Sequence, residues 1–367
     1  DMSRLHPGAH LTRLLAELGA DVVKVEPPGR GAPERSIPFT NAALHHSKRS
    51  LGLDTRHPDS VGVLDRLIAS ADVVVESASP GSLDARGAGY AHFSEVNPRL
   101  VWLSLNGFGS DGPYAATAGH DINYLGPSGF LSRLHGDSPD ALPDQPDVLL
   151  AGPIGAMMGV VGILAALRRR DQVGEGTFID DTIAGAVTWF MADDIAREAQ
   201  GHPAWEFDTP ARGTYRCADG KRIVVAAAEP RTWSALCGGL GLDDLDGQPG
   251  GPPDDKDGTR QRLTAAFATE SAAHWVANLG AAAVSPFHEP GDIPDDPHVQ
   301  ARGDVVEVPR GDGGTDRIVR LPMRMSGVDR PEVTPAPAVG ADTDDVLAES
   351  GFSPDEIAAL RDSAVVG

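Results

Sequence analysis

Apolar residues recur at helical and at strand spacing along the first half of the chain. Leucines at helical spacing predict an amphipathic helix over residues 10–18, and a similar pattern predicts a second one over 60–70. Short valine- and leucine-rich runs alternate with these helices and predict strands over 21–26, 72–76, 100–105 and 177–180. The pattern predicts an α/β fold with a Rossmann-like parallel sheet that is covered on both faces. Because no strand precedes the first helix, the first strand is expected to be missing from this sequence.

The pattern changes after residue 200, where strand and turn signals replace the alternation of helices and strands. Two apolar runs flank Ala218-Asp219-Gly220 and predict a β-hairpin over 213–217 and 222–228. Helices are expected over 182–200, 232–240, 260–279 and after an N-cap at Ser353, with loops over 243–257, 294–297 and 311–316. We expect a large α/β domain over residues 1–200, a smaller α+β domain over 201–300, and a C-terminal segment, 301–367, that returns to the large domain.

One apolar stretch, residues 148–167, allows two interpretations. It contains no charge and is followed directly by three arginines, a pattern that a membrane span shares. Pro153 near its start and glycines every three or four residues instead favour a helix that packs very closely against other elements. We interpret it as a helix that is apolar on all sides because it is wholly buried, and we expect no membrane attachment.

Charge and cysteine content narrow the class of protein. The 367 residues include 31 Lys and Arg against 53 Asp and Glu, a net charge of −22 that disfavours binding to nucleic acid or anionic lipid. Cys217 and Cys237 are too few for a disulfide framework, which favours a reducing, cytoplasmic location. No apolar run follows the N-terminus, so no signal peptide is expected, and no histidine pair has metal-ligand spacing.

The segment from Gly119 to Tyr124 concentrates reactive side chains. It includes His120, Asp121 and Asn123, and it comes after a glycine-rich loop of the kind that binds ligands at the carboxyl ends of parallel strands. A histidine oriented by a carboxylate can act as an acid or a base near neutral pH. The structural alternative is an exposed histidine beside an aspartate that caps a helix.

Outside this segment the sequence carries few chemical signals. The glycine motifs of dinucleotide and phosphate loops and the His-Glu-x-x-His motif are absent. Glu229 stands at the end of the strand predicted over 222–228, where a glutamate commonly caps a helix or is solvated.

Ordered matches along the whole chain identify a family resemblance. The matching segments are LGADVVKVE at 18–26, ADVVVE at 71–76, NGFG at 106–109, GHDINY at 119–124, VGILAAL at 161–167, CADG at 217–220 and EP at 229–230. They resemble the family III CoA-transferase (CaiB/BaiF) superfamily, and within it most closely the α-methylacyl-CoA racemases. The resemblance implies a protomer with a large Rossmann-type domain and a small one. It also implies an interlocked homodimer with the active site between domains at the subunit boundary.

The racemase resemblance assigns roles to individual residues. It implies that His120, paired with Glu229, exchanges the α-proton of an acyl thioester on one face, and that an aspartate does so on the other. The enolate formed between the two steps needs electrostatic stabilisation. The same pocket would be lined by Gly119, Asp121, Asn123 and Tyr124.

One departure from the family bears directly on the chemistry. Where the racemases have their second base and the transferases their nucleophilic aspartate, this chain has Gly152. Glycine has no carboxylate that could form the acyl anhydride of CoA transfer, so ordinary CoA transfer is disfavoured. Two-base racemisation then needs another acid, for which Asp180 and Asp121 are the candidates.

The arginines that bind CoA in the family are largely replaced. Three of these positions are occupied by Pro27, Ser79 and Ala85. Arginine is the natural bidentate partner of phosphate, so these replacements weaken the expectation that CoA binds. The remaining basic candidates for substrate binding are Lys48, Arg49 and Arg56.

The sequence therefore predicts an isomerase- or epimerase-like enzyme that transfers protons α to the carbonyl of an acyl group, with His120 as the working base. Epimerisation, isomerisation and elimination all fit, and the acyl group could be carried by CoA, by a carrier protein or by a free small molecule. One alternative is an acyl-CoA transferase whose nucleophile is Asp180 or Asp181. Another is a non-catalytic member that only binds a ligand or partner. No tightly bound cofactor and no metal are expected.

Overall fold

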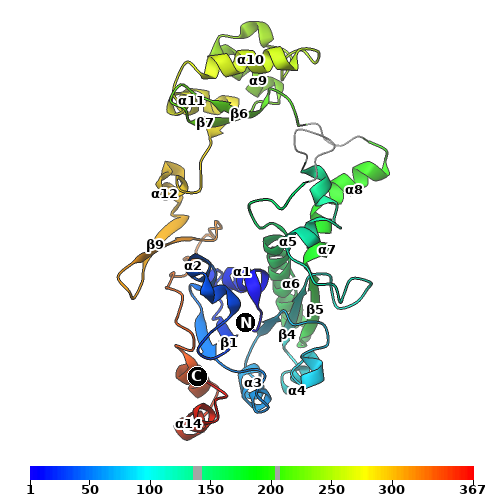
Figure 1. The fold of residues 1–367 in the computed structure, drawn as a ribbon, viewed down its shortest axis with the longest axis vertical. Coiled ribbons are helices and arrows are strands. Elements are labelled where there is room, and N and C mark those ends of the chain that lie inside the picture. The colour runs from blue at the N-terminus through cyan, green and yellow to red at the C-terminus, as the bar shows by residue number, and fades with distance from the viewer. Residues whose placement is uncertain (135–142, 203–206) are drawn as a thin grey trace. The chain divides into compact units, whose positions relative to one another are not determined.

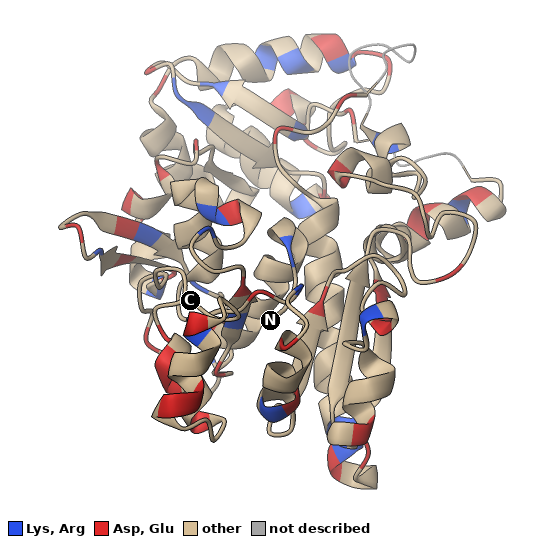
Figure 2. Ribbon diagram, turned by 60° about the horizontal axis from the view of Figure 1, so that its bottom comes forward, with Lys and Arg blue, Asp and Glu red and all other residues tan. Residues whose placement is uncertain are grey.

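The computed structural model describes residues 1–134, 143–202 and 207–367. The chain divides into two compact units, of which unit 1 comprises Asp1–Ala196 with Asp304–Gly367 and unit 2 comprises Arg197–Gly303 (Figure 1). Acidic residues are spread over the helices and loops of both units, so the net charge of −22 is not the property of one region (Figure 2).

The described part of unit 1 is built on parallel strands. They are β1 (Val23–Glu26), β2 (Arg49–Gly52), β3 (Val73–Glu76), β4 (Val101–Asn106) and β5 (Thr177–Thr182). β1 pairs with β2, and β4 lies between β3 and β5. Residues 1 and 2 join the two sets, because the Met2 amide donates to Val75 O at 2.8 Å and the Val25 amide donates to Asp1 O at 2.8 Å. The predicted α/β fold with a parallel sheet is confirmed.

Helices cover both faces of this sheet. Successive strand residues point to opposite faces, so Val75 and Leu103 pack on one side while Val74 and Trp102 pack on the other. The first side is covered by α1 (Leu5–Glu17), α6 (Ala151–Val173) and α7 (Ile183–Phe190). The second side is covered by α3 (Ser60–Ile68), α4 (Tyr90–Val96), α13 (Thr343–Glu349) and α14 (Pro354–Asp362). The C-terminal helices therefore complete one layer of unit 1.

Helix α6 is the long apolar helix expected from the sequence, but burial on all sides is wrong for the single chain. Its glycine face packs closely: a Cβ on Gly155 would lie 3.1 Å from Ile183, and one on Gly159 would lie 2.4 Å from Leu11. The opposite face exposes three apolar side chains, those of Met157, Val161 and Leu164. Among the described helices α6 alone is long and apolar enough to cross a membrane, and 44% of its apolar window is buried in the fold. The glycine face thus lets α6 pack closely against α1 and the start of α7.

Unit 2 combines a small antiparallel sheet with helices. Its strands are β6 (Arg212–Arg216), β7 (Arg222–Ala226) and β8 (Val284–Pro286), which confirms the predicted hairpin. The core around Trp233 and Phe267 is closed by α9 (Pro230–Leu240), α10 (Lys256–Phe267) and α11 (Ala272–Leu279). The single helix expected over 260–279 is wrong, because Ser271 starts a new helix by accepting a hydrogen bond from the His274 amide at 3.2 Å.

The remaining differences from the predicted elements are local. Residues 182–200 form two helices rather than one, α7 and α8 (Ala192–Ala199). The loop expected at 311–316 overlaps β10 (Thr315–Val319), which pairs with β9 (Val305–Pro309). Ser353 caps α14 as predicted, through the Glu356 amide at 3.3 Å. The other helices are α2 (Pro38–His45), α5 (Asp121–Leu125) and α12 (Pro297–Arg302).

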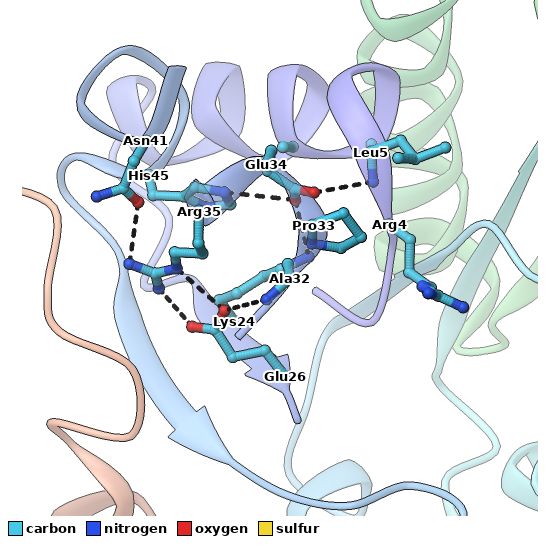
Figure 3. A network of polar contacts seen from close by, with 12 residues as sticks. Arg4, Leu5, Lys24, Glu26, Ala32, Pro33, Glu34, Arg35, Asn41 and His45 are labelled. Atoms are coloured by element: carbon cyan, nitrogen blue, oxygen red, sulfur yellow. Dashed lines mark hydrogen bonds and ion pairs between the residues drawn. The ribbon is translucent and has the colours of Figure 1, made fainter. Parts of the chain in front are cut away.

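Glu26, at the end of β1, ties the loop after β1 to the C-terminal segment (Figure 3). Its carboxylate accepts hydrogen bonds from the Arg35 guanidinium, from the Ala32 amide at 2.9 Å and from the Ser50 hydroxyl at 2.7 Å. Arg35 also donates to Pro337 O at 2.6 Å. The Glu26 side chain is fully buried, so this ion pair is an internal connection of unit 1.

A second group of buried ionisable side chains lies beside Glu26 (Figure 3). Glu34 accepts a hydrogen bond from the Leu5 amide at 3.2 Å, and its carboxylate lies 3.4 Å from His45 Nε2 and 4.0 Å from Lys24 Nζ. Burial lowers the pKa of His45 to about 4, although Glu34 opposes the shift. The group thus fixes the start of α1 from inside the fold.

Candidate functional site

The carboxyl end of β4 leads into the segment that holds the candidate base. His120 is the N-cap residue of α5 and forms a capping box with Asn123, whose Oδ1 accepts from the His120 amide at 2.9 Å. His120 is exposed in this structure. Its backbone is therefore fixed by the start of a helix while the residue stays accessible to a ligand.

Asp121 binds the start of α6 with both of its carboxylate oxygens. Oδ1 accepts from the Gly152 amide at 3.0 Å, and Oδ2 accepts from the Leu150 amide at 3.1 Å and from Gln145 Nε2 at 3.3 Å. A carboxylate is favoured at a helix N-terminus. A Cβ on Gly152 would lie 3.8 Å from Asp121 Oδ1 and 3.2 Å from Pro7 Cγ. The structure thus places a carboxylate oxygen of Asp121 within van der Waals contact of the position that a Cβ at residue 152 would take.

The ring of Tyr124 packs between two glycines, Gly107 and Gly119, and Gly119 directly precedes the candidate base. A Cβ on Gly107 would lie 2.6 Å from its ring and one on Gly119 would lie 2.8 Å away, so a larger residue would collide at either position. The Tyr124 hydroxyl donates to Gly119 O at 2.7 Å, and Phe108 contacts the ring edge-on at 5.2 Å between centroids. Burial, with a smaller contribution from Asp121, raises the pKa of Tyr124. Its hydroxyl therefore holds the backbone beside His120.

Glu229 lies in unit 2, at the N-cap position of α9. Its side chain makes no capping hydrogen bond to the helix backbone, and its carboxylate accepts from the Thr232 hydroxyl at 3.1 Å. Glu229 is exposed. Because His120 belongs to unit 1, the pairing of His120 with Glu229 stays a prediction.

The two aspartates near the end of β5 have different surroundings. Asp180 is exposed, and its Oδ2 accepts hydrogen bonds from the Ser110 amide at 3.0 Å and from the Ser110 hydroxyl. Asp181 Oδ2 is buried without a hydrogen-bond partner and would lie 2.7 Å from a Cβ on Gly159. Burial raises the pKa of Asp181 to about 6. Ser110 carries no signal in the sequence, because its partner lies 70 residues away and no local pattern joins them.

The basic candidates divide into engaged and accessible side chains. Lys48 is buried, its Nζ donates to Thr12 Oγ1 at 2.8 Å, and burial lowers its pKa well below the usual value. Arg49 forms ion pairs with two carboxylates. Arg56 is exposed. The guanidinium of Arg86, also exposed, donates to the carbonyl of Thr55, the residue before Arg56, at 3.4 Å. The structure therefore places Arg56 and Arg86 close together at the surface.

The candidate residues do not line the cavity at the end of α1. In the parts of the chain that the structure describes, no group of three or more His, Cys, Asp or Glu could hold a metal ion. A cavity of about 160 Å³ lies at the end of α1 and is lined in part by Met323, Met325 and Val328, but by none of the candidate residues. His120 and Asp121, after the end of β4, carry side chains that can act as acids and bases.

Comparison with known proteins places these features in a family. The model of CoA-transferase family III matches residues 1–343. The α-methylacyl-CoA racemase of Homo sapiens is 30% identical, over 100% of this chain and 95% of its own. The succinyl-CoA–L-malate CoA-transferase beta subunit of Chloroflexus aurantiacus is 28% identical, over 96% and 93%. A crystal structure of a CaiB/BaiF family protein from Brucella suis superposes with a TM-score of 0.83 at 27% identity, over 95% and 97% of the two chains. The chain belongs to CoA-transferase family III.

Proposed function

We propose that this protein moves a proton at the carbon α to the carbonyl of an acyl thioester, with His120 as the base. The observation that carries the proposal is the placement of His120, which is exposed after β4 and directly precedes the aspartate bound at Gly152. Loops at the carboxyl ends of parallel strands are where α/β folds bind their ligands. The racemases among the relatives support the same reaction class.

The proposed reaction needs one base and an enolate. The Cα–H bond breaks, the proton passes to the His120 imidazole, and the electron pair moves into the thioester carbonyl to give an enolate. Return of a proton to Cα restores the thioester, so no co-reactant is consumed. Histidine is the side chain most often used for proton transfer of this kind.

Asp121 is the second proton-transfer group in this proposal. Its Oδ1 lies 3.8 Å from the position that a Cβ on Gly152 would take, and it is therefore close to where a side chain at 152 would project. His120 and Asp121 must start the reaction in opposite protonation states, one bearing the proton and the other not. Delivery of a proton to the opposite face by Asp121 gives epimerisation, whereas return to the same face by His120 gives exchange with retention.

Glu229 is proposed to orient the His120 imidazole, as the resemblance to the racemases implies. Its carboxylate has a hydroxyl partner in Thr232 but makes no capping bond, so it is not committed to the α9 backbone. A Glu229→Gln variant is expected to lose activity while its thermal unfolding stays unchanged, since the side chain is exposed.

Arg56 and Arg86 are proposed to contact the phosphates of a CoA thioester. They are exposed and near one another, and guanidinium groups bind phosphate in a bidentate manner. Replacement of either by alanine is expected to raise KM and leave kcat unchanged, because the phosphates lie far from the reacting carbon.

Deuterium exchange tests the proposal directly. A 2-methylacyl-CoA is incubated in D2O with wild type, His120→Ala, or Asp362→Ala, which alters an exposed carboxylate at the end of α14. Wild type and the control should incorporate deuterium at Cα, and His120→Ala should be slower by about 10²–10⁴-fold. Equal exchange by His120→Ala, or none by wild type with any thioester tried, would overturn the proposal.

CoA transfer is the competing outcome, because transferases are also among the relatives. Succinyl-CoA and L-malate serve as donor and acceptor, and hydroxylamine traps any acyl-aspartyl intermediate. Formation of malyl-CoA together with a trapped adduct would replace the proton-transfer proposal. Binding of CoA without either reaction would indicate a non-catalytic member.

We also propose that two copies associate through the exposed face of α6. The side chains of Met157, Val161 and Leu164 form an apolar stripe at helical spacing, whereas the net charge of −22 would keep unmatched surfaces apart. Light scattering should give a dimer for wild type and a monomer for Val161→Arg. Val173→Arg, on the same helix but outside the stripe, is the control, and a monomeric wild type would contradict the proposal.

A further inference from the structure

We infer that Asp180 is a positioning residue that anchors the loop after β4 and, through it, the segment that carries His120. The inference rests on the proposed role of His120 and gives Asp180 a role other than nucleophile or second acid. It starts from the double hydrogen bond of Asp180 Oδ2 to the amide and hydroxyl of Ser110. A carboxylate that accepts two bonds from one residue restrains both its backbone and its side chain.

The anchored loop lies directly on the end of β5. Gly109 has a φ of +98°, which favours glycine, and a Cβ there would lie 2.9 Å from Thr182 Cγ2. The start of the loop is also tied to α7, because the Ala184 amide donates to Gly107 O at 3.0 Å. The loop is therefore fixed at Gly107 by the backbone and at Ser110 by Asp180.

The loop in turn supports the backbone before His120. Phe108, between the two fixed points, contacts the ring of Tyr124 at 5.2 Å, and Tyr124 holds Gly119 O through its hydroxyl. Gly107 and Gly119 leave no room for the Tyr124 ring to move toward either. Asp180 thus bonds to Ser110, the backbone joins Ser110 to Phe108, and Phe108 contacts Tyr124, which bonds to Gly119, the residue before His120.

The test compares Asp180→Ala with Asp180→Asn and Ser110→Ala, in the full chain. Asn keeps an acceptor oxygen for Ser110 but has no carboxylate, so it separates anchoring from chemistry. Amide hydrogen exchange over residues 107–124 reports the loop without reference to activity. Asp180→Ala should speed exchange there by about 10-fold or more, Asp180→Asn should resemble wild type, and Asp362→Ala should leave the segment unchanged.

The kinetic readouts follow the same logic. Asp180→Ala should lower kcat for α-proton exchange by about 10²-fold, since small displacements of a catalytic group have effects of that size. The pH at which the rate profile bends should not move, because Asp180 is not the titrating base. Adding Ser110→Ala to Asp180→Ala should cause little further loss, since both remove one interaction.

Three results would overturn the inference. They are unchanged hydrogen exchange over 107–124 in Asp180→Ala, an Asp180→Asn variant as inactive as Asp180→Ala, and an acyl adduct recovered on Asp180. If wild type catalyses no α-proton exchange, the proposed function fails, but the hydrogen-exchange comparison still decides whether Asp180 anchors the loop.

Discussion

Two regions of unit 1 use polar side chains in opposite ways. Around β1 and β2, the ionisable groups of Lys24, Glu26, Glu34 and His45 are buried. Glu26 is paired with Arg35, and Glu34 lies near Lys24 and His45. After the end of β4, the His120 side chain is exposed. The residue is held by a hydrogen bond of its backbone at the start of α5 and not by ion pairs. The first region holds the fold together, and the second holds a reactive group in place.

The difference separates ionisable side chains that stabilise this fold from those placed to react. A buried ion pair adds little net stability compared with apolar residues in its place. Removal of one partner nevertheless costs much stability, because it leaves an uncompensated charge inside the fold. An exposed group held by backbone contacts can be replaced without such a penalty. Variants in the first region should therefore change stability, and variants in the second should change activity.

The largest effect is expected for Glu26→Ala, which leaves the Arg35 guanidinium without its carboxylate inside the fold. The free energy of unfolding should fall by about 3–5 kcal/mol, as for other broken buried pairs. Guanidinium chloride unfolding measures the change. Glu95→Ala, an exposed residue of α4, is the control and should be nearly neutral. A small effect of Glu26→Ala would show that the buried region does not carry stability.

Asp121→Asn tests a residue with both a structural and a proposed catalytic role, because Asp121 bonds to the start of α6 and is proposed to transfer a proton. Asn keeps one acceptor oxygen but replaces the other with an NH2 donor, so one of the two amide hydrogen bonds is lost and the free energy of unfolding should fall by about 1–3 kcal/mol. Inversion at Cα should slow by about 10²-fold or more, since Asn cannot transfer the proton, while deuterium exchange with retention through His120 should continue. Chiral analysis alongside mass spectrometry separates the two rates. Equal loss of both would remove Asp121 from the proposed reaction and leave it only its bonds to α6.

The sequence could predict the architecture better than the packing. The valine-rich strands, the hairpin and the Ser353 cap all have local patterns, and they are where expected. The exposure of one face of α6 could not be predicted, because hydropathy gives Val160 and Val161 the same value although one is buried and the other exposed. The break at Ser271 was missed because its capping bond competes with an otherwise helical pattern.

At the candidate site too, the sequence predicts the local segment but not the contacts between distant residues. The segment from Gly119 to Tyr124 is contiguous, so a reader of the sequence can single it out. The contacts that position it are not local: Asp121 bonds to Gly152, 31 residues on, and Asp180 bonds to Ser110. The burial of Lys48, a candidate for substrate binding, is likewise set by distant partners, because its ammonium group is buried beside Asp1 and Thr12.

Acidification should destabilise the fold through His45. Burial lowers its pKa from 6.5 to about 4, so between these values the unfolded chain binds a proton that the folded chain does not. Its contribution to stability is complete above pH 6.5 and is lost as the pH falls toward 4. Wild type should therefore lose about 2 kcal/mol more than His45→Gln between pH 7 and 4.5. The exposed His274→Gln, in α11, should follow wild type, and parallel curves for all three would place the proton elsewhere.

Asp181 should show an effect no larger than that of His45, with the opposite pH dependence. Its Oδ2 is buried without a partner beneath Gly159, and burial raises its pKa from 3.8 to about 6, so the folded chain keeps a proton that the unfolded chain releases. This favours folding at low pH and is lost as the pH rises through 6. Asp181→Asn, which cannot ionise, should therefore gain about 2 kcal/mol over wild type at pH 7.5 and little near pH 4. Asp362→Asn, at the exposed end of α14, should gain at neither pH. A gain of equal size at both pH values would mean that packing against α6, rather than the charge of Asp181, limits stability there.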